Sequence, residues 1–214
     1  MYQYEYPHPA VTVDVVAFTL VEQTLQVLLI RRSEPPYRSE LALPGGFVRI
    51  DEGLEKGAYR VLCEKTPLKQ VYIEQLYTFG EPKRDPRERV ISVVYLAIIP
   101  TYQVFDNLEQ WHVVDDLPKL AFDHSAIVSL ARERLCSKLH YSSIAFRFLP
   151  TTFTLTDAQK IYEVIISESL EKRNFRKRLL ARGILKATGE MSSGGAHRPA
   201  QLYALKPVET LHYW

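Results

Sequence analysis

The stretch from Leu43 to Leu68 constrains the fold of this chain more than any other part of its 214 residues. Gly45 and Gly46 follow a short apolar run, and paired glycines permit a tight turn and a close approach of a ligand to the main chain. Helical character begins at Leu54, and Pro67 ends the helix because proline clashes with the preceding turn. The pattern predicts a strand, a glycine turn, a loop and a helix.

Carboxylates gather where this helix begins. Asp51, Glu52 and Glu55 lie near its positively polarised N-terminus. Arg60 and Glu64 are four residues apart and share one helical face. Without further context, the stretch is also compatible with an ordinary charged helix after a glycine turn.

The spacing of these residues resembles the signature box of the Nudix hydrolases, which cleave nucleoside diphosphates linked to another group. That box is a glycine, five residues, a glutamate, seven residues, and then Arg-Glu-apolar-any-Glu-Glu-any-Gly-apolar. Three positions depart from it, since Val61 and Lys65 replace glutamates and Pro67 replaces glycine. The matching positions are Gly46, Glu52, Arg60, Leu62, Glu64 and Leu68.

The departures from the box bear on its chemistry. Pyrophosphate hydrolysis uses Mg²⁺ or a similar ion, which requires several oxygen ligands at once. Positions 61 and 65 lie one helical turn apart, and this chain offers an isopropyl group and an ammonium there. We expect no catalytic residues and no metal, with Glu52, Arg60 and Glu64 remaining from the box. Residual activity stays open, because Glu52, Glu55 and Glu64 can still hold a weakly bound ion.

Apolar segments predict a sheet buried on both faces, with strands at 10–19, 25–32, 71–79 and 88–99. A helix from about 124 to 140, which Asp123 can cap, packs on this sheet or forms a dimer seam. The resemblance implies an α/β fold, a Nudix α/β/α sandwich with a mixed sheet. Cys63 and Cys136 fall in helical patterns without metal-type spacing, which predicts buried reduced thiols.

The loop at 80–89 holds two prolines and four cations. Its Gly-x-Pro-x-Arg-Asp-Pro-Arg segment resembles that of Nudix proteins related to ADP-ribose enzymes, and guanidinium forks suit phosphate. A solvated charged loop is the alternative, and His124 is either a ligand contact or a surface histidine. The expected ligand-binding residues are Arg31, Arg32, Gly45, Gly46, Phe47, Glu64, Arg84, Arg87, Arg89 and His124.

The last third of the chain has a different character. Residues 1–150 hold 17 Lys/Arg and 19 Asp/Glu, whereas residues 151–214 hold 10 and 6, which indicates a nucleic-acid-facing module. Thr156 to Gln159 is a capping-box pattern, and a second helix at 171–182 ends at Gly183. Strands at 184–188 and 201–205 complete the order of a small α+β winged helix-turn-helix. We expect a ligand-sensing domain at 1–140, a connector at 141–150 and a DNA-binding domain at 151–214.

The helix at 171–182 carries six cations and one acid. Arginine and lysine bond guanine, and asparagine bonds adenine, in the major groove that a recognition helix enters. Phe175, Leu179 and Leu180 are expected to face inward. A solvated charged face or a protein-docking module are the alternatives. The expected DNA-binding residues are Arg173, Asn174, Arg176, Lys177, Arg178, Arg198 and Gln201.

A degenerate Nudix domain followed by a winged helix resembles the Nudix-related transcriptional regulators of the NrtR family. The resemblance covers nearly the whole chain, in the segments 43–48, 84–87, 120–124, 172–176 and 198–203. It implies a homodimeric repressor of NAD biosynthesis or salvage genes, bound to double-stranded DNA and released by ADP-ribose or a related nucleotide, with no required cofactor. The alternatives are an active ADP-ribose pyrophosphatase and an arabinose-type, sugar-responsive repressor of the same architecture. No apolar run approaches the roughly 20 residues of a membrane span, so we expect a cytoplasmic protein without a membrane partner.

Overall fold

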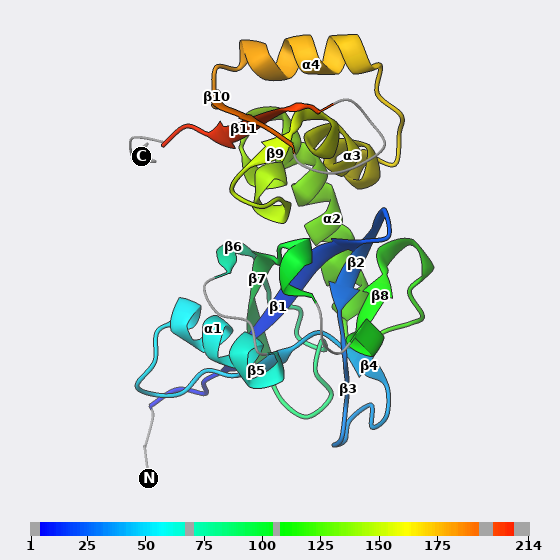
Figure 1. Ribbon diagram of the computed structural model, residues 1–214. Coiled ribbons are helices and arrows are strands. Elements are labelled where there is room, and N and C mark those ends of the chain that lie inside the picture. Colours follow the sequence, from blue (N-terminus) through cyan, green and yellow to red (C-terminus); the bar gives the residue numbers. More distant parts are fainter. Residues whose placement is uncertain (1–4, 67–70, 105–107, 193–198, 208–214) are drawn as a thin grey trace.

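The computed structural model describes residues 5–66, 71–104, 108–192 and 199–207 (Figure 1). The first part is a six-stranded mixed sheet in the order β6-β7-β1-β2-β8, with β5 paired to β1. Only the β1–β7 pairing in it is parallel among the described pairs. Its strands are β1 (Ala10–Val21), β2 (Thr24–Leu28), β5 (Gly45–Phe47), β6 (Tyr72–Phe79), β7 (Val90–Ile98) and β8 (Trp111–Val113).

The central strand β1 separates two apolar layers, as its unbroken run of buried residues requires. Val13, Val15 and Ala17 pack towards α1 (Leu54–Lys65). Val16, Phe18 and Leu20 pack towards α2 (His124–Tyr141), because side chains alternate along a strand. The expected mixed-sheet sandwich is therefore confirmed, and α2 uses its apolar face on the sheet.

Shorter elements complete this part of the chain. A two-stranded ribbon, β3 (Ile30–Arg31) with β4 (Leu41–Ala42), interrupts the strand expected at 25–32. The helix α1 begins at Leu54 as predicted and ends at Lys65, followed by Thr66 in an extended conformation that suits a residue before proline. The 3₁₀ turns are η1 (Thr101–Gln103), η2 (Leu108–Gln110), η3 (Val114–Asp116) and η4 (Ile144–Phe148).

The second part is a winged helix. A three-stranded antiparallel sheet in the order β10-β11-β9 accompanies two helices, and Phe175 and Leu179 lie in its core. The elements are β9 (Phe153–Thr154), α3 (Leu155–Ile166), α4 (Lys172–Ala181), β10 (Leu185–Met191) and β11 (Gln201–Leu205). The two parts share apolar packing, since Ile161 and Ile165 of α3 belong to the same core as α2.

The structure corrects four expectations. The capping box of α3 is Thr154 with Asp157, not the pattern at 156–159, because the helix begins two residues earlier. Leu180 is 44% exposed rather than inward-facing. Cys63 is exposed, since α1 turns it away from the sheet, and only Cys136 is partly buried. Asp123 sits at the N-cap of α2 without capping it. No helix in the described ranges is long and apolar enough to cross a membrane.

Candidate functional site

The surviving box carboxylates are paired with arginines. Arg60 donates two hydrogen bonds to Glu52, from Nε at 2.8 Å and from Nη2 at 2.5 Å, and Nη2 also donates to the Phe47 carbonyl. These bonds from Arg60 lower the pKa of Glu52 to about 2. Glu64 is exposed and forms ion pairs with Arg60 and Arg49. Both carboxylates therefore have arginine partners, and the pairs of Glu64 are exposed.

The first departure from the box is part of the core. Val61 is 2% exposed and packs with the layer beneath α1. Its Cγ2 would lie 3.2 Å from a β-carbon on Gly46, so the glycine turn rests directly on it. Within the described residues no group of three His, Cys, Asp or Glu side chains is arranged to hold a metal ion.

A pocket of about 200 Å³ lies beside the glycine turn, on the α2 side of the sheet. It contains seven of the ten expected ligand-binding residues; Arg31, Glu64 and Arg89 are not among its lining. Arg31 donates instead to the Ser39 carbonyl, and Arg89 to the Gly80 carbonyl. The lining residues are Thr12, Asp14, Ile30, Arg32, Leu43, Gly45, Gly46, Phe47, Arg84, Asp85, Arg87, Phe122 and His124.

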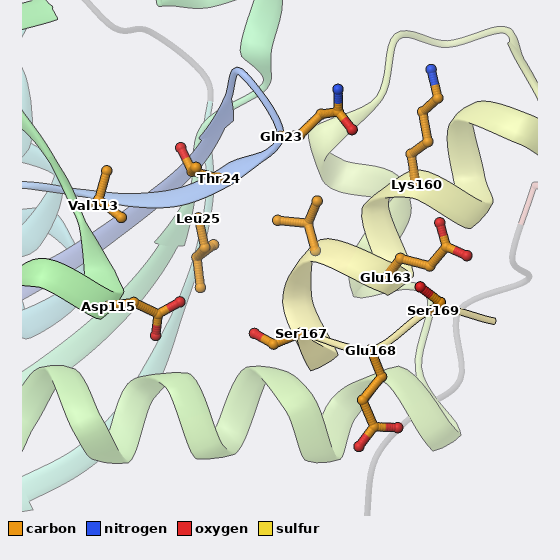
Figure 2. Close-up of a pocket in the computed structure, with 11 residues that line it drawn as sticks. Gln23, Thr24, Leu25, Val113, Asp115, Lys160, Glu163, Ser167, Glu168 and Ser169 are labelled. Carbon is orange, nitrogen blue, oxygen red and sulfur yellow. The ribbon is translucent and has the colours of Figure 1, made fainter.

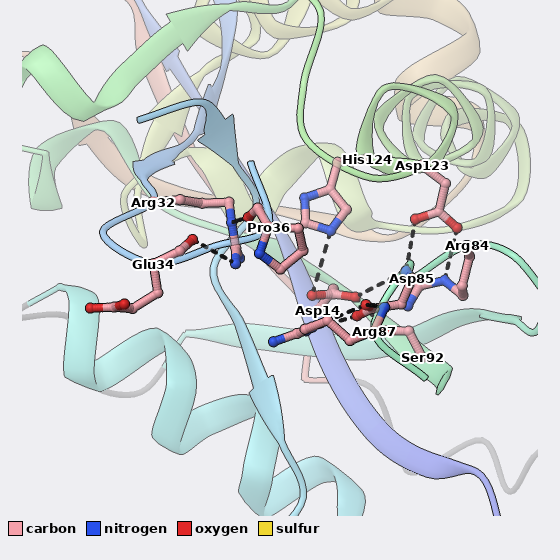
Figure 3. Close-up of polar contacts among 10 residues, drawn as sticks. All are labelled: Asp14, Arg32, Glu34, Pro36, Arg84, Asp85, Arg87, Ser92, Asp123 and His124. Atoms are coloured by element: carbon pink, nitrogen blue, oxygen red, sulfur yellow. Dashed lines mark hydrogen bonds and ion pairs between the residues drawn. The ribbon is translucent and has the colours of Figure 1, made fainter. Parts of the chain in front are cut away.

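A buried carboxylate, Asp14, lines this pocket and lies among several polar partners (Figure 3). Asp14 of β1 is 6% exposed and accepts a 2.5 Å hydrogen bond from the Ser92 hydroxyl. Arg84 Nη2 lies 3.5 Å from its Oδ2, and His124 Nε2 lies 3.8 Å from its Oδ1. Sequence reasoning missed Asp14, although a single acid inside a valine-rich strand was a visible signal.

His124 is buried rather than a surface histidine. Its Nδ1 accepts a 2.9 Å hydrogen bond from the Leu43 amide, so in the neutral ring the proton is on Nε2, which faces Asp14. Burial lowers the pKa of His124, which keeps the ring neutral at pH 7. His124 therefore links the start of α2 to the segment before the glycine turn.

Arg84 and Arg87 of the 80–89 loop have different environments in the structure. Arg84 is 8% exposed. Its guanidinium donates two hydrogen bonds to the carboxylate of Asp123, from Nε at 2.9 Å and from Nη2 at 2.7 Å. This explains why Asp123 does not cap α2. Arg87 is anchored by Asp85, yet its side chain is 41% exposed and lies over the rings of Phe47 and Phe122.

Arg32, which directly follows β3, meets the same aromatic ring. Its guanidinium lies 4.7 Å from the Phe122 centroid, and its Nε donates to the Pro36 carbonyl. Phe122 has a φ of 54°, a strained conformation for a large residue, and Tyr37 packs edge-on against it. Arg32 and Arg87 are thus held around one aromatic ring at the pocket.

The glycine turn has a steric requirement. A β-carbon on Gly45 would lie 2.0 Å from Asp14 Oδ1, closer than atoms can approach. Gly45 pairs with Asp14 across the β1–β5 ladder, so neither residue can shift independently. The turn that the sequence predicted as a close approach for a ligand is therefore also a close approach to Asp14.

The second candidate site is the outer face of α4, at the end of the molecule farthest from α1 (Figure 1). Glu171 caps the helix by accepting from the amides of Arg173 and Asn174. Phe175 and Leu179 point into the winged-helix core. The exposed polar side chains are Lys172, Arg173, Asn174, Lys177 and Arg178.

The other expected DNA-binding residues differ in environment. Arg176 Nη2 donates to the Thr156 hydroxyl, and its Nε is buried without a partner among the described residues. The amide of Gln201 donates to the carbonyls of Glu190 and Leu202. Arg198 lies outside the described residues.

Family models match both parts of the chain. A NUDIX domain model matches residues 9–131, and a model described as the NrtR DNA-binding winged helix domain matches residues 145–205. The matched ranges do not fix the domain limits expected at residues 140 and 150, which remain predictions.

The chain is similar to proteins of several organisms. It is 40% identical to an ADPR responsive transcriptional repressor NtrR of Acinetobacter baylyi, over 93% of this chain and 83% of the relative. Shewanella oneidensis NrtR complexed with a 27mer DNA superposes with a TM-score of 0.82 and 38% identity, over 92% and 94% of the two chains. The NUDIX domain of that protein complexed with ADP ribose superposes with a TM-score of 0.54 and 38% identity, over 61% of this chain and 90% of that chain.

A further relative is an enzyme. An ADP-ribose pyrophosphatase of Methanocaldococcus jannaschii is 38% identical over 58% of this chain and 73% of the relative. That match is shorter than the repressor's. Because a NUDIX domain and an NrtR winged helix domain occur in one chain that aligns with such regulators over most of its length, the chain belongs to the NrtR family of Nudix-related transcriptional regulators.

Proposed function

We propose that the protein is a transcriptional repressor that binds operator DNA through α4 and the paired strands β10 and β11. ADP-ribose, or a related nucleotide, binds the pocket beside Gly45 and releases the DNA. The observation that carries this proposal is the joining of an arginine-lined pocket to an exposed cationic helix in one chain. The similarity to the ADPR responsive repressor of Acinetobacter, and to Shewanella NrtR in complexes with DNA and with ADP ribose, supports it.

In this proposal Arg32 and Arg87 bind the pyrophosphate, because both are anchored beside the pocket and charge-assisted bonds suit phosphate. The ring of Phe122 lies between them. Thr12 contributes a buried hydroxyl that has no partner among the described residues and is available to a ligand hydroxyl. Arg84 contributes indirectly, since its fork is already bonded to Asp123.

On DNA, Arg173, Asn174, Lys177 and Arg178 contact bases or phosphates of the major groove. Arg176 holds α4 on α3 through Thr156. We also propose a cytoplasmic homodimer, because two recognition helices related by symmetry match a palindromic operator. The regulated genes are proposed to serve NAD biosynthesis or salvage.

Fluorescence anisotropy tests the central proposal. A labelled duplex, selected from a random library by binding to the protein, is titrated with ADP-ribose, and arabinose serves as the competing effector. ADP-ribose at micromolar to millimolar concentration should release the DNA, and arabinose should not. A DNA complex that survives millimolar ADP-ribose excludes this effector, and release by arabinose alone would favour the sugar-responsive class.

The second candidate function is ADP-ribose pyrophosphatase activity, favoured by the retained Glu52 and Glu64 and by the Methanocaldococcus relative. We propose that hydrolysis is absent or very slow, because Val61 occupies a core position and Arg60 bonds Glu52. AMP release from ADP-ribose with Mg²⁺ or Mn²⁺ decides between them. Turnover at or above the roughly 1 s⁻¹ of ordinary enzymes would show an active hydrolase.

A further inference from the structure

The helix α2 connects the two candidate sites. It is 18 residues long, which corresponds to about 27 Å. At its first residue, His124 lies in the ligand pocket and bonds the Leu43 amide. The preceding residue, Asp123, holds Arg84 of the same pocket. The beginning of α2 is therefore bonded to residues that line the pocket.

The other end of α2 is bonded to the residue that ends the recognition helix. Arg182, the C-cap of α4, donates from Nη1 to the Leu139 carbonyl at 3.2 Å and from Nη2 to the Ser142 carbonyl at 2.7 Å. Its Nη1 also donates to the Tyr162 hydroxyl at 3.0 Å. The last carbonyls of a helix have no partner within it and carry its negative pole, so a guanidinium is well suited to them. Arg182 thus caps the C-terminus of α4 and also bonds carbonyls at the C-terminal end of α2.

Two further bonds hold α2 to α3. Cys136 Sγ donates to the Ile165 carbonyl at 3.3 Å, and Arg132 Nη2 donates to the Ser167 hydroxyl at 3.1 Å. Elsewhere α3 faces the first domain across a cavity of about 310 Å³, lined by Thr24, Val113 and Lys160 among others (Figure 2). The winged helix is therefore held to the first part of the chain along α2 and through the apolar core that α3 shares with β2, and an open pocket lies beside this contact.

We propose that Arg182 is a positioning residue that fixes the direction of α4 relative to α2 and so transmits the state of the ligand pocket to the DNA-binding face. This inference rests on the proposed function. The competing role is a direct phosphate contact. The three side-chain hydrogen bonds of Arg182 are internal and part-buried, whereas the side chain of Arg178 in α4 is exposed to solvent.

The experiment measures the coupling factor, defined as the DNA Kd with saturating ADP-ribose divided by the DNA Kd without it. Coupling between sites is typically about 5- to 150-fold. In Arg182→Gln the factor should fall to within about threefold of one, while calorimetry shows an ADP-ribose Kd close to that of the wild type. The matched control Arg178→Gln should weaken DNA binding, lower the salt dependence, and keep the wild-type coupling factor.

Each outcome has a defined meaning. An unchanged coupling factor in Arg182→Gln overturns the inference, and so does a loss of DNA affinity that matches Arg178→Gln in salt dependence and coupling. If the wild type itself shows no release by ADP-ribose, the proposed function fails first. If Arg182→Gln does not fold, Arg182→Lys and Tyr162→Phe replace it, since each removes part of the contact. Wild-type coupling in both of these would also overturn the inference.

Discussion

The guanidinium of Arg60 bonds both carboxylate oxygens of Glu52, at 2.8 Å and 2.5 Å. The pair closes the loop between the glycine turn and α1, because Arg60 also reaches the Phe47 carbonyl and Glu52 accepts from the Arg49 amide. A glutamate that this resemblance places in a hydrolytic box therefore has a structural role here.

This pairing predicts a pH dependence of stability. The hydrogen bonds from Arg60 lower the pKa of Glu52 from 4.5 to about 2. The stabilisation is present above pH 4.5 and is lost as the pH falls towards 2, because the unfolded chain takes up the proton first. Urea unfolding of the wild type and Glu52→Gln should differ at pH 7, and the difference should shrink steadily as the pH falls from 4.5 towards 2. A difference that stays constant with pH would contradict the ion-pair explanation.

Gly45→Ala should damage the ligand pocket. The added β-carbon would lie 2.0 Å from Asp14 Oδ1, so the strand must shift, at a cost of about 1–3 kcal/mol in the free energy of unfolding. ADP-ribose affinity should fall as well. Gly53→Ala is the matched control, because nothing lies within 4 Å of its β-carbon. Calorimetry and urea unfolding measure both effects, and equal behaviour of the two variants would show the contact to be unimportant.

Arg32→Ala should weaken ADP-ribose binding by about 10- to 100-fold, the loss expected for one charge-assisted contact of about 1.5–3 kcal/mol. The neighbouring Arg31→Ala should have little effect, since Arg31 bonds Ser39 outside the pocket lining. Both variants should bind DNA as the wild type does in the absence of ligand. Isothermal titration calorimetry makes the comparison, and equal losses would contradict the assignment of Arg32, rather than Arg31, to the ligand pocket.

Arg173→Ala and Lys177→Ala should weaken DNA binding and leave ADP-ribose binding intact. If each residue contacts a phosphate, the slope of log K against log salt should fall by about one. Lys160→Ala on α3 is the control, because it removes an exposed cation elsewhere in the winged helix. Anisotropy titrations at several salt concentrations provide the test. Unchanged operator affinity in both α4 variants would remove α4 from the interface.

His124→Ala should destabilise the fold by about 1–3 kcal/mol, because it leaves the buried Leu43 amide without its acceptor. His124→Asn keeps an amide oxygen that can accept this bond, and should recover part of the loss. Thermal unfolding of the three proteins measures the difference. Identical melting of the alanine and asparagine variants would show that the hydrogen bond contributes little.

Sequence reasoning found the parts of this fold that depend on local signals. Leu54 was identified as the first residue of α1, and the glycine turn and the helix that becomes α4 were located, because each is marked by neighbouring residues. The cap of α3 was misplaced because two threonines, Thr154 and Thr156, both precede carboxylate or amide side chains at plausible spacing.

The pocket was only partly predictable. Its cationic and glycine residues were found through motifs, whereas Asp14, Asp85 and Phe122 were missed. Asp14 and Phe122 act through partners distant in sequence, Ser92 and Arg32, and no local pattern records those contacts. The same reason explains Asp123, which was expected to cap α2 and instead bonds Arg84, 39 residues away. Asp85 instead bonds Arg87, two residues away, so its absence from the prediction does not have this cause.

The apolar residues that α3 inserts beside α2 have one more consequence. Ile161 and Ile165 complete the core that the central sheet and α2 begin. Unfolding the winged helix would expose this shared core to water. We therefore expect the winged helix and the sheet domain to unfold as one cooperative unit, with a single calorimetric peak. Ligand bound beside Gly45 should then raise the melting temperature of residues that it never touches.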